Sequence, residues 1–262
     1  MLYLEYMKKA FQQRFAYRVN FFVSSIGNFL WIFIQVSVWQ ALFEHNATVE
    51  GISLTDMISF VILNLFITSL SRTNLGVRLG ERINSGQIVN DFIKPINIKY
   101  FLFSEDFGGK LFNLIFTVIP TVTIASYFWG FSLPVLNINL ILFLITVING
   151  LIISYNLSFI FGLFAFWLKD SWYVDWYLRA LTKLFGGTLV PLWFYPDLLY
   201  KISKVLPLRL IVFEPINIYL DKISYQQAVD VIYQQLIWIV VLLVIEKLVW
   251  KLAQKKITIF GG

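Results

Sequence analysis

The chain has 262 residues, 58% of them hydrophobic and only 14% charged, with a formal net charge of +6. A soluble domain with this balance would lack the polar side chains needed to cover its surface, so the composition predicts an integral membrane protein. There is no cysteine and a single histidine, His45. The sequence therefore offers neither a disulfide framework nor a metal site built on thiolates, and no cofactor is expected in the chain itself.

Residues 1–18 are predicted to form an amphipathic helix in the membrane interface. Lys8 and Lys9 lie on one side of it, and the other side carries Tyr3, Tyr6, Met7, Ala10, Phe11 and Phe15. Such a helix places its rings in the acyl boundary and its ammonium groups toward anionic headgroups. The apolar side serves either as a membrane anchor or as a docking surface for a partner.

Six predominantly apolar segments are predicted to cross the bilayer as helices, for which about 20 residues each suffice. The turn signal Trp129–Pro134 divides the long uncharged run 111–168 into two spans, which are expected to form a tight helical hairpin. The fold class is thus an all-α polytopic membrane protein with one transmembrane domain, 1–262. The expected spans are 19–43, 54–71, two within 111–168, 172–193 and 226–247.

The distribution of lysine and arginine predicts the orientation of the chain. Of the 21 basic residues, only Lys201, Lys204, Arg209 and Lys222 fall on one side of the membrane, and all the others fall on the opposite side. Because cytoplasmic loops carry the excess of positive charge, both ends of the chain are expected in the cytoplasm of a multi-pass protein of the cell membrane. This asymmetry accounts for the net charge without a nucleic-acid partner.

The predicted cytoplasmic loop 72–99 contains two short helices. Ser85-Gly86 ends the first and starts the second, and Pro95 stops the second. In the second helix one face is apolar, formed by Ile88, Val89, Phe92 and Ile93. A loop in water has little reason to carry such a face unless it packs against protein or rests on the bilayer.

With these features in order, the chain resembles the permease subunits of ABC transporters of the type-2 export class, within a branch of six-span subunits. The resemblance covers nearly the whole chain. It rests on Arg18-Val19-Asn20-Phe21 after the amphipathic start, on Ile83-Asn84-Ser85-Gly86-Gln87-Ile88 to Lys94-Pro95-Ile96-Asn97, on Gly186-Gly187-Thr188-Leu189-Val190-Pro191 before Tyr195-Pro196, on Leu206-Pro207 and Glu214-Pro215, and on the closing Lys255-Lys256-Ile257 to Gly261-Gly262.

The resemblance implies that the loop after the second span is the coupling helix that sits in a cleft of a cytoplasmic ATPase. The residues so implicated are Glu81, Arg82, Ile83, Gly86, Ile88, Val89, Phe92, Ile93 and Pro95. The implied partners are ABC ATPase subunits that bind ATP and Mg²⁺, a second permease subunit (a homodimer or a related permease), and membrane lipids. The alternative for the loop is a helix lying on the membrane surface.

Two further regions have two interpretations each. The segment 194–224 carries a helical apolar stripe, and the resemblance implies short external or re-entrant helices that act as a structural lid or contact substrate. In the fifth span, Asp175, Arg179 and Lys183 stand at i, i+4 and i+8. Ionisable residues in a membrane helix suggest a polar portal for substrate. A position near the cytoplasmic end instead favours snorkelling side chains and an Asp175–Arg179 pair.

The sequence carries no ATPase motif, because no lysine is followed by Ser or Thr, as the phosphate-binding G-x-x-x-x-G-K-[ST] loop requires. The chain is therefore expected not to be an enzyme. The function that fits is the membrane permease of an ATP-driven exporter for an amphipathic drug, peptide, lipid or glycan. The alternative is a stand-alone secondary carrier or lipid scramblase. Such a carrier would need an intramembrane proton or ion relay, and the predicted spans are poor in Asp, Glu and His.

Overall fold

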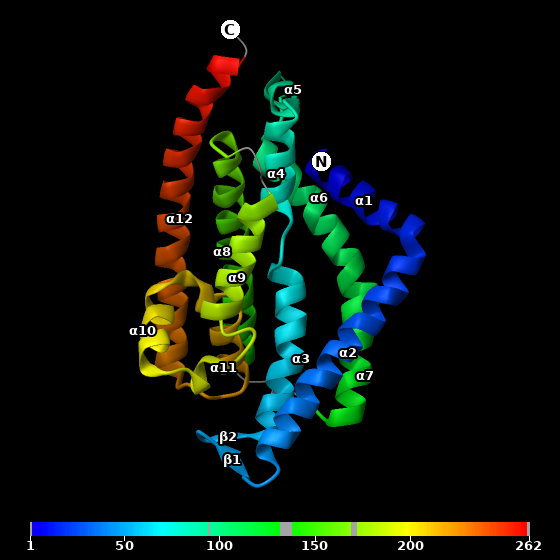
Figure 1. Ribbon diagram of the computed structural model, residues 1–262, viewed down its shortest axis with the longest axis vertical. Coiled ribbons are helices and arrows are strands. Elements are labelled where there is room, and N and C mark those ends of the chain that lie inside the picture. Colours follow the sequence, from blue (N-terminus) through cyan, green and yellow to red (C-terminus); the bar gives the residue numbers. More distant parts are fainter. Residues whose placement is uncertain (1, 94, 132–137, 169–171, 261–262) are drawn as a thin grey trace.

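The structure, a computed structural model, describes residues 2–93, 95–131, 138–168 and 172–260, with their side chains except those of 17–20, 92, 172, 174, 175 and 257–260. Figure 1 shows long helices running between the two ends of the molecule. The first half comprises α1 (Leu2–Gln13), η1 (Arg14–Tyr17), α2 (Arg18–Phe43), β1 (Thr48–Val49), β2 (Ile52–Ser53), α3 (Leu54–Ser71), α4 (Leu75–Asn84), α5 (Gln87–Ile93), α6 (Ile98–Asn113), the π-helical turn η2 (Leu114–Val118) and α7 (Ile119–Trp129). The second half comprises α8 (Ile138–Leu163), η3 (Phe164–Phe166), α9 (Trp172–Phe185), η4 (Leu192–Phe194), α10 (Asp197–Val205), η5 (Pro207–Leu210), α11 (Phe213–Tyr219) and α12 (Tyr225–Phe260).

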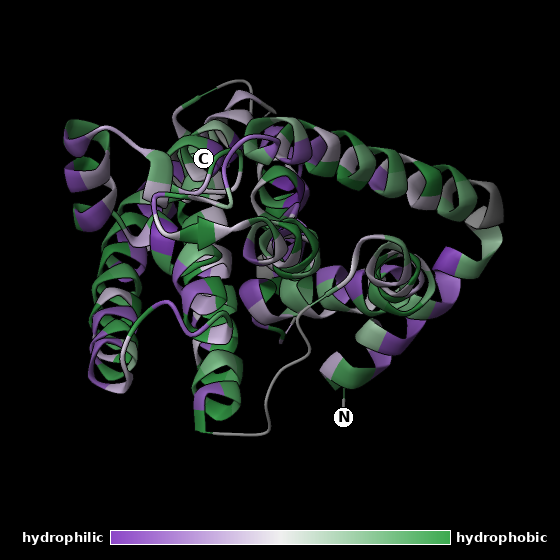
Figure 2. Ribbon diagram, turned by 90° about the horizontal axis from the view of Figure 1, so that it is seen from below, coloured by the Kyte–Doolittle hydropathy of each residue, from purple (hydrophilic) through white to green (hydrophobic). Residues whose placement is uncertain are grey.

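Among the described residues, five helices are long and apolar enough to cross a membrane. They are Phe21–Phe43, Leu54–Asn84, Ile98–Trp129, Ile138–Phe166 and Tyr225–Lys256. Most of their residues are hydrophobic, as the green parts of the ribbons in Figure 2 show, and α2 exposes Phe22, Ile26, Leu30 and Phe33. A chain that is apolar on the outside is suited to lipid rather than water.

The remaining predicted span, 172–193, is not a single long helix. Its helical part, α9, has 14 residues. Gly187 then takes a left-handed φ of 69°, a conformation that glycine adopts without strain, and the chain continues without helix to Pro191. In Figure 1, α9 and the segment after it carry the chain back toward the end where α10 and α11 lie.

Both ends of the chain lie at the same end of the molecule. The first residues of α1 and the last turns of α12 lie near α4 and α5, and the β1–β2 hairpin, α10 and α11 occupy the opposite end (Figure 1). We call α4 and α5, residues 75–93, the elbow, and refer to the elbow end and the hairpin end of the molecule. This arrangement matches the predicted placement of the loop 72–99 on the same side as both ends of the chain.

The second long helix, α3, begins at a complete capping box. The Ser53 hydroxyl accepts a hydrogen bond from the Asp56 backbone N–H (3.1 Å), and the Asp56 carboxylate accepts one from the Ser53 N–H (3.2 Å). Both donors would otherwise be unpaired at the helix start. Lys222 Nζ lies 2.6 Å from the Asp56 carboxylate and so ties this end of α3 to the segment that precedes α12.

The predicted tight hairpin between the third and fourth spans is wrong. The helix Ile98–Trp129 ends at Gly130, which has a φ of 79°. Its last part, α7, packs against α2 and α3, whereas α8 packs mainly against α12, α4 and α11. The buried face of α8 is thus covered by helices that follow it or come from the elbow, and not by the helix immediately before it.

The amphipathic helix α1 lies along α6. The ring of Tyr6 packs edge-on against Phe101 at a centroid distance of 4.7 Å, and the ring of Phe15 packs against Phe112 at 5.0 Å. Gly108 lets the two backbones touch, since a Cβ there would collide with the Met7 carbonyl oxygen. The aromatic side that was predicted to enter the acyl boundary is therefore partly covered by α6, and Phe15 remains 44% exposed.

Between residues 194 and 224 the chain forms α10, η5 and α11 at the hairpin end. The six residues from Phe213 to Ile218 in α11 are all buried. The Tyr219 ring stands 5.1 Å from that of Phe143, and burial raises the pKa of Tyr219 to about 12. In α10, by contrast, Leu198 and Val205 are exposed. This segment thus inserts α11 into the bundle and leaves α10 on its surface.

Candidate functional site

The elbow is a helix–turn–helix in which the chain changes direction at Ser85-Gly86. Gly86 adopts a φ of 75°, where a side chain would be strained, and its carbonyl accepts a hydrogen bond from the Val89 N–H (3.2 Å). The helix break predicted at these two residues is confirmed. The second helix, α5, ends at Ile93, two residues before Pro95.

An ion pair fixes the two helices of the elbow to each other. Arg82 Nη1 of α4 lies 2.6 Å from Asp91 Oδ2 of α5, and the Asp91 side chain is almost fully buried. The Arg82 guanidinium also sits 5.0 Å from the centre of the Phe101 ring on α6. Arg82 therefore connects α4, α5 and α6 through one side chain, in charge-assisted and cation–π contacts.

The predicted apolar face of α5 divides into a buried part and an exposed part. Ile88 is only 3% exposed and belongs to a core with Leu79 and Leu102. Val89 and Ile93 are 49% and 79% exposed. The side chain of Phe92 lies outside the described residues. Ile88 thus anchors α5 to its own bundle, and Val89 and Ile93 face outward.

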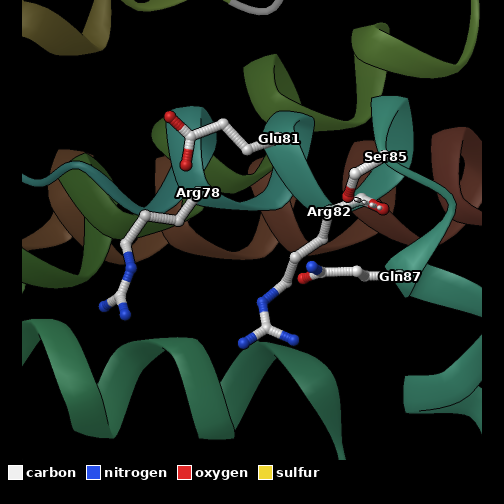
Figure 3. Close-up of a pocket in the computed structure, with 5 residues that line it drawn as sticks. All are labelled: Arg78, Glu81, Arg82, Ser85 and Gln87. Carbon is white, nitrogen blue, oxygen red and sulfur yellow. Dashed lines mark hydrogen bonds between the residues drawn. The ribbon is translucent and has the colours of Figure 1, made fainter.

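The other residues predicted for this site lie on α4 and just after α5. Glu81 is exposed, Ile83 is half-buried against the core beneath α4, and Pro95 is exposed. A cavity of about 360 Å³ opens here, lined by Arg78, Glu81, Arg82, Ser85 and Gln87. Figure 3 shows Arg78 and Arg82 pointing to the same side, toward α6, and Glu81 pointing away from them.

Arg179 and Lys183, two of the three residues of the predicted polar portal, have different surroundings. Arg179 Nη2 donates a hydrogen bond to the Asn74 side-chain oxygen (2.8 Å), at the start of α4, and Lys183 is exposed. The side chain of Asp175 lies outside the described residues. Arg179 thus links α9 to the elbow.

Sequence reasoning missed two acidic residues that organise this end of the molecule. Asp91 pairs with Arg82, and Asp106 binds residues of the linker before the elbow. The sequence holds one signal for Asp106, which is the i, i+4 spacing to Lys110 just before a long uncharged run. Across the described parts of the chain, no group of three or more His, Asp or Glu side chains is placed to hold a metal ion.

The comparisons with known proteins identify a family of membrane proteins. The family model described as ABC-2 family transporter protein matches residues 29–261, which is most of the chain. No curated protein and no solved structure matches the chain with significant similarity. The matched range contains the elbow and all five long helices apart from the first turns of α2. The chain belongs to the ABC-2 family of transporter membrane proteins.

Proposed function

We propose that the protein is the permease subunit of an ATP-driven ABC exporter, and that the elbow is where a separate ATPase docks. The observation that carries this proposal is the exposed pair Val89 and Ile93 on a helix held rigidly by Ile88 and the Arg82–Asp91 ion pair. A rigid helix with exposed apolar side chains at one end of a helical bundle is suited to insertion into a groove of a partner (Figure 1). Glu81, Gly86 and Pro95 complete the proposed docking segment.

The energy for transport is assigned to the partner because the chain contains no phosphate-binding loop. ATP and Mg²⁺ would be bound by the ATPase. A second permease subunit, either another copy or a related chain, would complete the path for an amphipathic drug, peptide, lipid or glycan. Membership of the ABC-2 family supports an ATPase partner.

We further propose six crossings, with α9 and the segment up to Trp193 forming the fifth. The location of both ends of the chain beside the elbow supports an even number of crossings (Figure 1). The excess of lysine and arginine at the elbow end supports a cytoplasmic location for that end. On this basis the β1–β2 hairpin, α10 and α11 face the outside of the cell membrane.

Cysteine labelling tests this orientation without any background, because the natural chain has no cysteine. Ala47, before β1, and Gln254, near the end of α12, are both exposed. In intact cells, an Ala47→Cys variant is expected to react with a membrane-impermeant maleimide, and a Gln254→Cys variant only after the cells are opened. Labelling of Gln254→Cys in sealed cells would refute the proposed topology.

Val89→Asp is expected to weaken binding of the ATPase by about tenfold or more, since it buries a charge in the proposed interface. The measurement is the amount of ATPase that copurifies with the permease at matched expression. Val205→Asp is the control, because it makes the same change at a 72% exposed position on α10, at the opposite end of the molecule. It should retain the ATPase.

Two results would contradict the docking proposal. One is a Val89→Asp variant that retains the ATPase and transports normally, which would leave α5 as a helix resting on the membrane surface. The other is transport by the permease alone, in vesicles that contain neither an ATPase nor ATP. That second result would favour a secondary carrier or scramblase.

A further inference from the structure

The joint between the elbow and the second membrane span is a break in the helix at residues 72–74. α3 ends at Ser71 and α4 begins at Leu75. A helix end leaves carbonyl groups unpaired, and a helix start leaves N–H groups unpaired. Without other partners, such a break would be a flexible hinge, and the elbow could move without moving the spans.

Side chains of α6 bind this break from one side. Lys110 Nζ donates to the Leu70 carbonyl oxygen near the end of α3 (2.8 Å). Asp106 Oδ2 accepts a hydrogen bond from the Thr73 hydroxyl (2.7 Å), and Asp106 Oδ1 lies 3.4 Å from the Asn74 backbone nitrogen. Thr73 in turn accepts a hydrogen bond from the Leu75 N–H (3.1 Å). Two residues of α6 thus bind one carbonyl and one N–H at the break, and Asp106 also holds the Thr73 side chain that binds a third backbone group.

Side chains of α8 bind the break from another side. Ser154 Oγ donates to the Ser71 carbonyl oxygen (2.7 Å), and Ser158 Oγ accepts from the Gly76 N–H (3.0 Å). Tyr155 donates its hydroxyl proton to Asp106 Oδ2 (2.8 Å), so the contacts from α6 and α8 meet at one carboxylate. The first turn of α4 is therefore held against α8 as well as α6.

The contacts around Asp106 are more buried than the neighbouring Arg78–Glu105 ion pair, and this burial makes them stiffer. The side chains of Asp106 and Lys110 are each 10% exposed, with 3.3 Å between their charged atoms. Arg78 of α4 and Glu105 of α6, which form the neighbouring ion pair, are 36% and 24% exposed. Hydrogen bonds and ion pairs are stronger in a region of low dielectric constant, and water screens the exposed pair.

We propose that Asp106 is a positioning residue that makes the elbow and the spans α3, α6 and α8 move as one body. A force on α5 then shifts these helices together, and the chain does not bend at residues 72–74. This inference rests on the proposed function, because it assumes that an ATPase moves the elbow. Asp106 lies on α6, away from the exposed Val89 and Ile93, so its replacement should leave the docking surface intact.

The test compares docking with the distance across the break at residues 72–74. Spin labels are placed on cysteines introduced at Thr55, in the first turn of α3, and at Ser85, in the elbow, which are both exposed. The permease is reconstituted in nanodiscs with its ATPase, and the distance between the labels is measured before and after trapping with Mg-ATP and vanadate. In the natural chain the distance should stay constant on trapping, because the joint keeps the elbow and α3 in one body. In Asp106→Asn the ATPase should bind and be trapped normally, and the distance should change.

Two companion variants keep the test decisive. Thr73→Val removes the bond from the linker to Asp106 but keeps the Asp106–Lys110 pair, so it should also let the distance change, even if Asp106→Asn fails to fold. Glu105→Gln breaks the more exposed Arg78–Glu105 pair and should behave as the natural chain. A constant distance in Thr73→Val and in any folded Asp106→Asn, or a changing distance in the natural chain, would overturn the joint while leaving the proposed function intact. No ATPase binding by the natural chain would overturn both.

Discussion

Arg209→Met is expected to destabilise the protein by about 3 to 5 kcal/mol, because it leaves a buried carboxylate without its counter-charge. Arg209 of η5 and Glu214 of α11 are both buried and paired with each other. Arg209 also donates to the Gln234 side chain on α12, and Asn217 donates to Glu214 (3.3 Å). This cluster connects the segment 194–224 to the last membrane helix.

The measurement is thermal unfolding of the purified variant in detergent or nanodiscs. The double variant Arg209→Met/Glu214→Gln should recover much of the loss, because it leaves no unpaired charge in the interior. Lys204→Met is a matched control, since it removes an exposed cation 4.6 Å from the Tyr200 ring centre and should cost about 1 kcal/mol at most. An unfolding temperature of Arg209→Met equal to that of the natural chain would show that the ion pair is not needed.

Gly76→Ala is expected to cost about 3 kcal/mol, the upper end of the range for overpacking a close contact. A Cβ on Gly76 would collide with the carbonyl oxygen of Ser158, and a Cβ on Gly162 would lie 2.7 Å from the Cα of Gly76. Backbone atoms form both contacts, so no side chain can rotate away. The first turn of α4 would have to move off α8.

The matched control is Gly27→Ala in α2, where a Cβ would meet nothing within 4 Å. Since alanine is the better helix former, this change should be neutral or stabilise by about 1 kcal/mol or less. Gly162→Ala should resemble Gly76→Ala, because it approaches the same contact from α8. Equal unfolding temperatures for Gly76→Ala and Gly27→Ala would show that α4 and α8 do not pack closely in the native protein.

Local patterns predicted the parts of the fold that depend on local chemistry. Predominantly apolar segments of about 20 residues indicated where the long helices lie. The break at Ser85-Gly86 followed from the conformational freedom of glycine, and the end of α5 followed from Pro95. These features depend on a few neighbouring residues and therefore can be recognised in one sequence.

Features that depend on packing between distant segments were not predictable in this way. The spacing of the apolar residues in α5 shows that Ile88 and Val89 share one side of the helix. The burial of Ile88, however, depends on the core that it forms with Leu79 and Leu102. Asp106 meets Thr73 and Tyr155 from two other helices, and nothing in the local sequence indicates which partners it will have. Helix α9 was expected to be long because hydropathy does not register the turn that Gly187 allows.

The shared location of the two ends of the chain has a practical consequence for work with this protein. An affinity tag or fluorescent protein fused at either end would sit at the elbow end of the molecule (Figure 1), where it would compete for space with a partner docked on α5. The turn between β1 and β2 offers a different insertion point. Glu50 and Gly51 are exposed there, at the opposite end of the molecule, and short polar insertions are best tolerated at such turns. An epitope at this turn would leave the elbow uncovered.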